Sequence, residues 1–219
     1  MKAPFLIIAL PQVKDPYFHQ SIVLITDHDE FGSEGIVLNN PITLDSKEVI
    51  SDWLAEEESS KESSKENSPF LNAFNYDFSH EHIEIEDSIF LGGPVQEESL
   101  FTLHSIRELS SISIQVTPTL FMSTHPDIIK MLIEDENYFK RKRFFLGCSA
   151  WKKDQLENEI KAGDWMHIPS FDSDSILFNF KPQENTPNLK QKIWTDFLGK
   201  EGISPFNFMP SHDQELTLN

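Results

Sequence analysis

The fold of this 219-residue chain is set by GIVLNNP (Gly35 to Pro41), FLGGPV (Phe90 to Val95) and FFLGCSAW (Phe144 to Trp151), the last followed closely by QLENEI (Gln155 to Ile160). The first three stretches each combine an apolar run with Gly, Asn or Pro, which is the pattern of a buried strand next to a turn. None of them contains a recognisable catalytic motif. They therefore indicate a structure more clearly than they indicate a reaction.

Three strands are predicted N-terminal to and within the first stretch, over residues 5–10, 21–26 and 35–39. They are aliphatic and β-branched, and turns at Asp15-Pro16 and Phe31-Gly32 separate them. Their nearly continuous apolarity predicts burial on both faces. A short helix is expected next, because an acidic capping pair precedes apolar residues at helical spacing, which are Val49, Ile50, Trp53 and Leu54.

Residues 56–68, EEESSKESSKENS, contain no apolar side chain and repeat Ser-Ser-Lys-Glu. Such a segment cannot bury enough surface to offset its ordering entropy, so a disordered acidic insertion is predicted. No linker divides the rest of the chain. One domain over residues 1–219 is expected.

The second half of the chain mixes strands and helices. Strands are predicted over residues 83–86, 89–91, 100–104, 112–116, 119–122 and 143–150. Helices are predicted from Thr124 and Asp127, from Asp154 to Gly163, and from Thr186-Pro187. Strands first and mixed elements later favour an α+β fold over a regularly alternating one.

The composition limits the kinds of partner. Most of the eighteen Phe are assigned to the core, and the formal charge is -18, with fifteen acids and three Lys between Asp45 and Glu98. The electrostatic field of such an acidic chain repels the phosphate backbone of DNA and disfavours nonspecific DNA binding.

The cysteine content and the N-terminal apolar run bear on the compartment. The single cysteine, Cys148, cannot form an internal disulfide, which favours a reducing cytoplasm. The apolar run over residues 5–10 is too short to cross a membrane, so no membrane association is expected.

Two glycine-containing motifs are candidate sites of chemistry. Gly147-Cys148-Ser149-Ala150-Trp151 begins like a nucleophile elbow, but Trp151 stands where that turn needs a second Gly. Neither Ser149 nor Cys148 is therefore expected to be a nucleophile. Gly92-Gly93-Pro94 lacks the Lys and the hydroxyl of a phosphate-binding loop, which favours a tight turn.

Two clusters of charged residues are further candidates for a site. His80 and His82, among Glu81, Glu84 and Glu86, could bind a metal ion, but a solvated edge strand is favoured; Asp27-His28-Asp29 with His19 is an equally weak signal. No metal site and no cofactor are expected. The only basic run, Lys140 to Arg143, is flanked by aromatic residues and is the best candidate for contact with DNA. A solvated turn between a helix and a strand is the favoured interpretation.

Several separate motifs give the chain a resemblance to the bacterial YqgE/AlgH family, and it extends over most of residues 5–210 apart from the acidic insertion. The matching positions are Asp15, Pro16, Phe18, Ser21, Ile22, Gly32, Gly35, Ile36, Asn39, Pro41, residues 92–95 and residues 151–160. The resemblance implies a strongly bent mixed sheet that forms a pseudo-barrel with helices packed outside. It assigns no biochemical activity.

The AlgH branch of the family has been named a transcriptional regulator, and family genes often neighbour a gene for a Holliday-junction resolvase-like nuclease. This chain departs from the family pattern at Gln20, Asn40 and Asp154. The first two replace residues that are commonly cationic. Any anion site shared by the family is therefore weakened here.

The first hypothesis is a non-enzymatic cytoplasmic protein that acts through contacts with a protein partner, with transcriptional regulation as a candidate process. Its candidate surface comprises Phe18, His19, Asn39, Pro41, Gly92, Gly93, Pro94, Trp151 and Gln155. The alternatives are a small-molecule or nucleotide-binding protein, which could be an enzyme, and a regulator that binds DNA through Lys140, Arg141, Lys142 and Arg143. The oligomeric state is left open.

Overall fold

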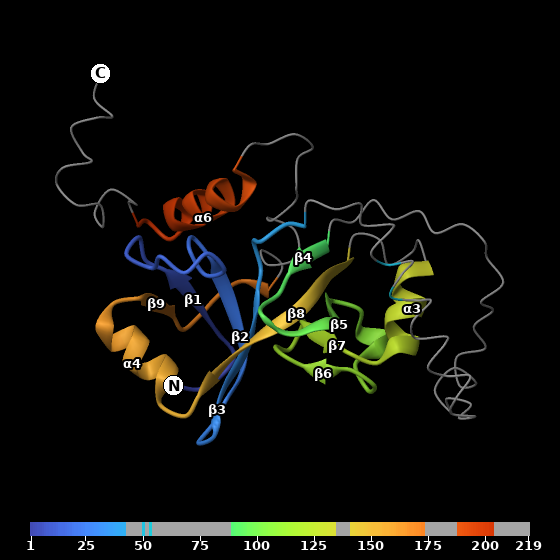
Figure 1. The fold of residues 1–219 in the computed structure, drawn as a ribbon. Coiled ribbons are helices and arrows are strands. Elements are labelled where there is room, and N and C mark those ends of the chain that lie inside the picture. Colours follow the sequence, from blue (N-terminus) through green and yellow to red (C-terminus); the bar gives the residue numbers. More distant parts are fainter. Residues whose placement is uncertain (43–49, 51–52, 54–88, 135–140, 174–187, 204–219) are drawn as a thin grey trace.

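The computed structural model describes residues 1–42, 50, 53, 89–134, 141–173 and 188–203. Its elements are β1 (Phe5–Ala9), β2 (Ile22–His28), β3 (Gly32–Val37), β4 (Ile89–Leu91), β5 (Val95–His104), the 3-10 turn η1 (Arg107–Leu109), β6 (Ile114–Gln115), β7 (Phe121–Ser123), α3 (Pro126–Glu134), β8 (Lys142–Lys152), α4 (Gln155–Ala162), β9 (Trp165–Ile168) and α6 (Leu189–Lys200) (Figure 1). The predicted α+β class is confirmed.

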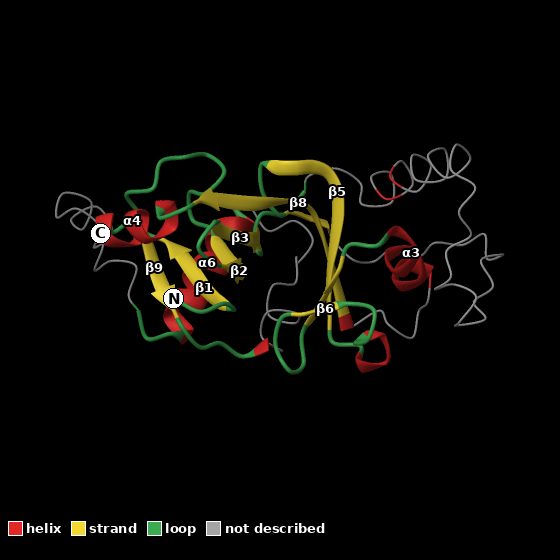
Figure 2. Ribbon diagram, turned by 90° about the horizontal axis from the view of Figure 1, so that it is seen from below, coloured by secondary structure: helices red, strands yellow, loops and turns green. Residues whose placement is uncertain are grey.

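The nine strands of the described part form one sheet in the order β6-β7-β5-β8-β3-β2-β1-β9, and β4 pairs with β8 outside this order. The β4–β8 pairing is parallel and the other pairings are antiparallel, so the sheet is mixed. β8 pairs with β5 through its first half and with β3 through its second half. The sheet bends along β8, and helices pack outside it (Figure 2). This is the bent architecture that the family resemblance implied.

The predicted burial on both faces is confirmed for β1 and for the inner parts of β2 and β3, whereas the hairpin ends of β2 and β3 are more exposed. Every residue of β1 is at most 1% exposed. Alternate side chains of a strand point to opposite faces, so Leu6 and Ile8 pack toward α6 while Phe5 and Ile7 pack in the cluster that contains Leu156 of α4. The indole of Trp194 on α6 also donates a hydrogen bond to the Ala9 carbonyl (2.9 Å).

The other half of the sheet is covered by α3. Ile129 and Leu132 of this helix pack in one cluster with Leu100 of β5 and Phe144 of β8. Ile50 and Trp53 join the same cluster, and both are helical and buried. The predicted helix after β3 is thus confirmed at these two positions, and its other residues lie outside the described part.

Gly92 and Gly93 allow the β4–β5 connection to lie directly against β8. A Cβ at Gly92 would be 2.2 Å from the Gly147 carbonyl oxygen, and a Cβ at Gly93 would be 2.1 Å from that of Cys148. The Gly92 N–H donates to Leu146 O (2.7 Å), and the Gly92 carbonyl accepts from Val37 N (2.8 Å). The GGP stretch therefore joins β3 and β8 by close backbone approach, in agreement with a structural turn.

Two local expectations need correction, and one strand was missed. The predicted strand over residues 112–116 is only the two-residue β6, because Val116 N and Thr117 N both turn to bond Leu120 O. Asp154 does precede α4, but it has φ 61° and makes no capping bond through its side chain. β9 was not predicted at all, although it pairs along β1.

Other predictions fall on residues that the structure does not describe. These are the acidic insertion over residues 56–68, the strand over residues 83–86 and the helix start at Thr186-Pro187. α6 begins at Leu189, after Asn188.

Candidate functional site

Eight of the nine residues of the predicted surface separate into two groups, and His19 belongs to neither. Asn39, Pro41 and Gly92 to Pro94 lie along the connections between the strands. Asn39 is completely buried; its Oδ1 accepts from Ile22 N (2.9 Å), and its Nδ2 donates to the carbonyls of Gln20 (2.8 Å) and Lys190 (3.1 Å). Pro41 forms a backbone bridge to Phe90. The contacts of Asn39, Pro41 and the two glycines hold the fold together.

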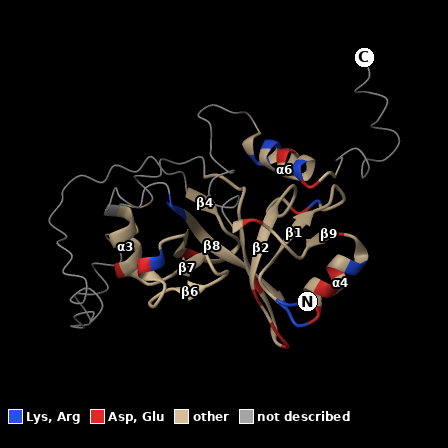
Figure 3. Cartoon of the chain, turned by 180° about the vertical axis from the view of Figure 1, so that it is seen from behind, with Lys and Arg blue, Asp and Glu red and all other residues tan. Residues whose placement is uncertain are grey.

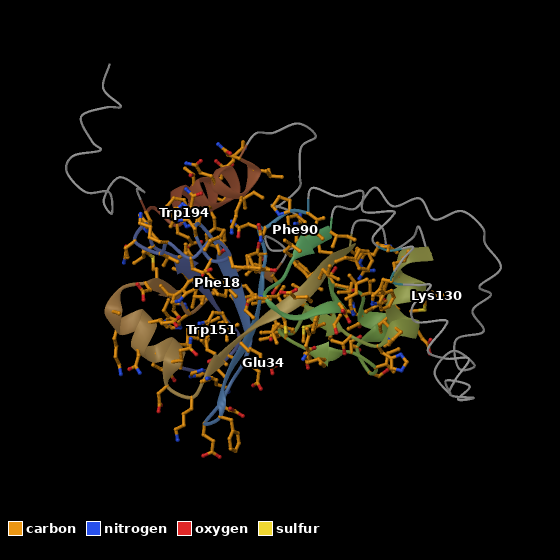
Figure 4. All side chains as sticks on the ribbon, viewed as in Figure 1. Phe18, Glu34, Phe90, Lys130, Trp151 and Trp194 are labelled. Carbon is orange, nitrogen blue, oxygen red and sulfur yellow. The ribbon has the colours of Figure 1, made fainter. Side chains whose placement is uncertain are left out.

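Phe18, Trp151 and Gln155 form the second group, because they line one open hollow beside α4. We call it the α4 groove; its volume is about 380 Å³, and its walls are Gln12, Val13, Lys14, Asp15, Phe18, Ala150, Trp151, Gln155, Glu159, Asp164 and Trp165. Figure 4 shows Phe18 and Trp151 close together in the half of the molecule that carries α4. Residues from three separate sequence motifs thus meet at one surface.

The loop before β2 forms one wall of the groove and is held by its own hydrogen bonds. Asp15 Oδ1 accepts from the backbone N–H groups of Tyr17 (2.9 Å) and Phe18 (3.1 Å). His19 Nδ1 lies 2.8 Å from Val13 O, so its ring belongs to the loop and not to the groove wall. Lys190 Nζ donates to Tyr17 O (2.7 Å) from α6, and burial lowers the pKa of Lys190 to about 8 although Asp15 opposes the shift. These bonds fix the position of Phe18.

Glu159 is the centre of the opposite wall. Its Oε2 accepts from the indole N–H groups of both Trp151 (2.9 Å) and Trp165 (2.8 Å), and its Oε1 accepts from Gln155 Nε2 (2.9 Å). Gln155 and Glu159 are four residues apart on α4 and so lie on the same face of the helix. Gln155 Oε1 in turn accepts from Lys152 N (3.0 Å) at the end of β8. Side chains from β8, α4 and β9 are thereby joined through one carboxylate.

Three aromatic rings pack together at this site. The ring centroids of Phe18 and Trp151 are 5.8 Å apart, those of Phe18 and Trp165 are 5.5 Å apart, and those of the two indoles are 6.0 Å apart. The last two pairs meet at 77° and 82°, which is the favoured edge-to-face arrangement. Trp151 and Trp165 are 5% and 4% exposed. The aromatic wall is therefore rigid and largely preformed.

Both nucleophile candidates of the sequence occupy buried positions on β8. Ser149 is completely buried and its hydroxyl donates to Gly92 O (3.1 Å). Cys148 is 7% exposed, and burial, followed by the charge of Glu34, raises the pKa of its thiol. A reactive cysteine needs the opposite shift.

A Ser–His–Glu arrangement occurs at the β2–β3 hairpin. His28 Nδ1 lies 2.8 Å from Ser33 Oγ, and His28 Nε2 lies 3.4 Å from Glu157 Oε1. His28 and Ser33 are directly opposite each other on paired strands, so their contact is a cross-strand pair. Ser33 is 5% exposed and pairs with Trp151 of β8 on its other side. We assign this arrangement to the packing of α4 on the sheet.

A second histidine network lies in the other half of the sheet. His104 Nε2 is 3.0 Å from Ser123 Oγ and 3.1 Å from Ser113 Oγ, and the two hydroxyls are 2.9 Å apart. Because Ile106 N donates to His104 Nδ1 (3.3 Å), the proton of the neutral ring is on Nε2. The ring therefore donates to the serines and does not act as their base.

The basic run is less exposed than predicted. Lys142 and Arg143 are each 6% exposed, because they belong to β8 and pack near the rings of Phe144 and Phe90. Arg141 is half-buried and donates to Ser105 O, while Lys140 lies outside the described residues. The solvated turn is thus wrong for Lys142 and Arg143. DNA binding through this run stays a prediction, with a smaller basic surface than the sequence suggested.

The sequence offered two candidate metal sites, one at His80 and His82 and one at Asp27-His28-Asp29 with His19. His80 and His82 lie outside the described residues. Among the residues that are described, no three His, Cys, Asp or Glu side chains are grouped as metal ligands would be. In the same part of the chain, no helix combines the length and the apolarity needed to cross a bilayer.

Glu159, Asp164 and Trp165 were not among the site residues predicted from the sequence. One signal was available, because the spacing of Gln155 and Glu159 places a second polar side chain beside Gln155 on α4. The participation of Trp165 depends on β9 pairing with β1, which no motif indicated.

Comparison with known proteins gives a consistent result. The AlgH-like family (DUF179) matches residues 6–205. A UPF0301 protein of Shewanella woodyi is 29% identical over 197 residues, covering 86% of this chain and 91% of its own length. A UPF0301 protein of Yersinia pseudotuberculosis is 29% identical over 204 residues, with 93% and 94% covered.

Two solved structures show the same fold. The solution structure of the AlgH protein from Pseudomonas aeruginosa has a TM-score of 0.58 at 24% identity and covers 92% of this chain and 89% of its own. A crystal structure of a protein from Corynebacterium diphtheriae has a TM-score of 0.59 at 19% identity, with 96% and 93% covered.

Proposed function

The chain belongs to the AlgH-like family. We propose that it is a non-enzymatic binding protein that holds a segment of a partner protein in the α4 groove. The observation that carries the proposal is the meeting of Phe18, Trp151 and Gln155 in one open hollow. Aromatic side chains surrounded by a polar rim are typical of protein-binding surfaces.

The rigidity of the groove supports the same function. Its two walls are held by internal hydrogen bonds, so little conformational entropy is lost when a partner binds. The candidate nucleophiles Ser149 and Cys148 are buried outside it. The groove therefore offers contacts to a partner and no activated group to a substrate.

We extend the proposal to gene regulation through a protein contact. A chain with a formal charge of -18 is repelled by the phosphate backbone, which favours an indirect route over direct DNA binding. The cytoplasm is the compartment that we propose, because the only cysteine is a free thiol.

Site-specific photo-crosslinking tests the proposal. A benzophenone amino acid at Lys14, on the exposed rim of the groove, should capture a discrete protein in the native host, whereas the same residue at Glu108, on η1, should not. Phe18→Ala in the Lys14 background should weaken the adduct, because it removes one aromatic wall. The proposal fails if both positions capture the same proteins, or if the adduct is unaffected by Phe18→Ala.

A second candidate function is small-molecule binding. The volume of about 380 Å³ falls within the range of roughly 300–1,000 Å³ that is usual for small-ligand pockets. A thermal-shift screen of metabolites tests it, because a ligand present at about 100 times its Kd stabilises a protein by roughly 2.7 kcal/mol. A hit whose effect disappears in Phe18→Ala would favour this function over the first.

A further inference from the structure

The charges of the α4 groove are unbalanced. Asp15, Glu159 and Asp164 contribute three carboxylates to its walls, and Lys14 is the only Lys or Arg among the lining residues. Within the described part of the chain, none of the three carboxylates forms an ion pair. Acidic positions on α4 are visible in Figure 3. The walls of the groove therefore carry a net negative charge, which the nearby Lys190 of α6 offsets in part at Asp15.

Glu159 is a fixed carboxylate within this field. Its three hydrogen-bond donors, two indoles and one amide, are all neutral. They orient the group without cancelling its charge. Oε2 accepts two bonds and Oε1 accepts one, so Oε1 retains acceptor capacity for a further donor. A carboxylate that is already oriented needs little rearrangement to receive a cation.

The aromatic wall suits the same ligand. The face of an aromatic ring attracts a cation, and Trp does so most strongly. Long basic side chains also pack their methylene stems on apolar surfaces while their charged ends reach a polar group. Phe18, Trp151 and Trp165 border the groove together with Glu159. A wall for the stem and an acceptor for the charged end are thus present at one site.

We infer that the groove binds an arginine or lysine side chain of the partner protein, with its stem along Phe18 and Trp151 and its cationic end toward Glu159 Oε1. This inference rests on the proposed protein-binding function and adds the chemical class of the contact. Arginine fits better than lysine, because its planar, weakly hydrated guanidinium stacks on aromatic rings.

Other ligand classes fit the charges less well. A phosphate or an acidic side chain would face three carboxylates, and like charges at short range repel. A purely apolar segment would remove water from Asp15, Glu159 and Asp164 without replacing those hydrogen bonds, which costs free energy. Only a cationic group both neutralises the groove and satisfies its acceptors.

The indole N–H signals of Trp151 and Trp165 provide the test, because both groups bond to Glu159 and report directly on it. The full chain is titrated by heteronuclear NMR with three peptides, acetyl-Gly-Leu-X-Leu-Gly-amide, in which X is Arg, Gln or Glu. The Arg peptide should shift both signals with an affinity about tenfold or more above that of the Gln peptide, and the Glu peptide should shift neither. Raising the salt from about 0.05 M to about 0.5 M should weaken binding of the Arg peptide.

Two variants locate the charge. Glu159→Gln keeps an acceptor for the indoles and removes the charge, so it should reduce affinity for the Arg peptide about tenfold and leave that for the Gln peptide unchanged. Asp164→Asn should act in the same direction, and it is the safer variant because the Asp164 side chain makes no hydrogen bond to the described residues. Glu108→Gln, on η1, is the matched control and should change nothing.

The outcomes separate this inference from the proposed function. Equal binding of the Arg and Gln peptides, or no shift with any peptide, overturns the inference, while a groove-specific adduct from Lys14 would leave the proposed function standing. Ethylguanidinium binding as tightly as the Arg peptide would also overturn it, because the site would then be one for small cations. If the benzophenone at Lys14 captures no protein and none of the three peptides binds, both the inference and the proposed function are overturned.

Discussion

Two hydrogen-bonded clusters, one in each half of the sheet, centre on a single titratable side chain and differ in what they leave open. His104, on β5, is completely buried, and Ile106 N, Ser113 and Ser123 use both of its ring nitrogens. Glu159, on α4, is half-buried and keeps acceptor capacity after receiving three donors. The number of hydrogen bonds is similar, so it does not separate a structural cluster from a binding site.

Charge and access separate the two clusters. Burial, followed by the charge of Arg141, lowers the pKa of His104 to about 4, so the imidazole is neutral near neutral pH. Its ring stacks on Phe121 with centroids 5.7 Å apart, which closes the site. Glu159 instead borders an open groove and has no counter-ion within the described residues. A closed neutral cluster contributes to stability, whereas an open cluster with uncompensated charge can also bind.

The largest expected effect comes from breaking the aromatic wall of the Glu159 cluster. Trp151→Ala removes a buried indole that contacts Phe18 and Trp165, and should lower the free energy of unfolding by about 3–5 kcal/mol. Chemical denaturation measures the change. Phe31→Ala is the matched control; its ring is 78% exposed, and the change should stay below about 0.5 kcal/mol. A loss below about 1 kcal/mol for Trp151→Ala would mean that the wall is not a packed unit.

The next effect belongs to the His104 cluster and depends on pH. Between the ordinary pKa of 6.5 and the folded-state pKa of about 4, the unfolded chain binds a proton at this residue that the folded chain does not. The free energy of unfolding therefore falls as the pH is lowered through this window, by roughly 3 kcal/mol in total from this group.

His104→Gln checks this prediction. The amide can still donate to the serines but does not titrate, so the acid-side loss of stability should shrink by that amount between pH 6.5 and 4. Urea unfolding of both proteins across this range measures it. Identical pH profiles would show that His104 becomes charged inside the fold without cost.

A smaller effect distinguishes the two roles of Glu159. Glu159→Leu leaves the indole N–H groups of Trp151 and Trp165 without their acceptor and should destabilise the chain by about 2 kcal/mol. Glu159→Gln keeps that acceptor and should cost less than about 1 kcal/mol. Thermal unfolding of the two variants side by side gives the comparison. Equal losses would indicate that the charge, and not the hydrogen bonds, stabilises the cluster.

A strand and its burial could be predicted from the sequence where the strand's own residues are distinctive. Five successive apolar residues in β1 predicted burial on both faces, and Leu6 and Phe5 indeed face different clusters. β9 could not be predicted in this way, because Trp165–Ile168 is only four residues long and becomes a strand by pairing with the free edge of β1. Its partner lies more than 150 positions earlier in the chain.

The candidate site was predicted in part for a similar reason. Phe18, Trp151 and Gln155 could be found as motif residues, but the sequence did not show that they meet. Asn39 was grouped with them because it is polar within an apolar stretch, yet it faces inward and bonds the backbone of Ile22 and Gln20. A polar residue that satisfies buried backbone and one that contacts a ligand look the same in a sequence.

The smallest effect concerns Cys148, on the strand that joins the two halves. The thiol is 7% exposed and its pKa is raised, so iodoacetamide should react with the folded chain at least about tenfold more slowly than with the unfolded chain, without any change of stability. Mass spectrometry follows the rate. Fast labelling under native conditions would show that the two halves separate locally at β8.

The central position of β8 also has a consequence for how the protein is made. Gly35 of β3 pairs with Ser149, and Phe101 of β5 pairs with Phe145. Neither β3 nor β5 can therefore complete its pairing until β8 has been synthesised. During synthesis the β2–β3 hairpin leaves the ribosome long before that segment does, and its outer edge stays unpaired meanwhile. Open edges of this kind invite pairing with other chains. The nascent chain is therefore most vulnerable to aggregation in the interval before residues 142–152 emerge, and ribosome-associated chaperones would have their largest effect there.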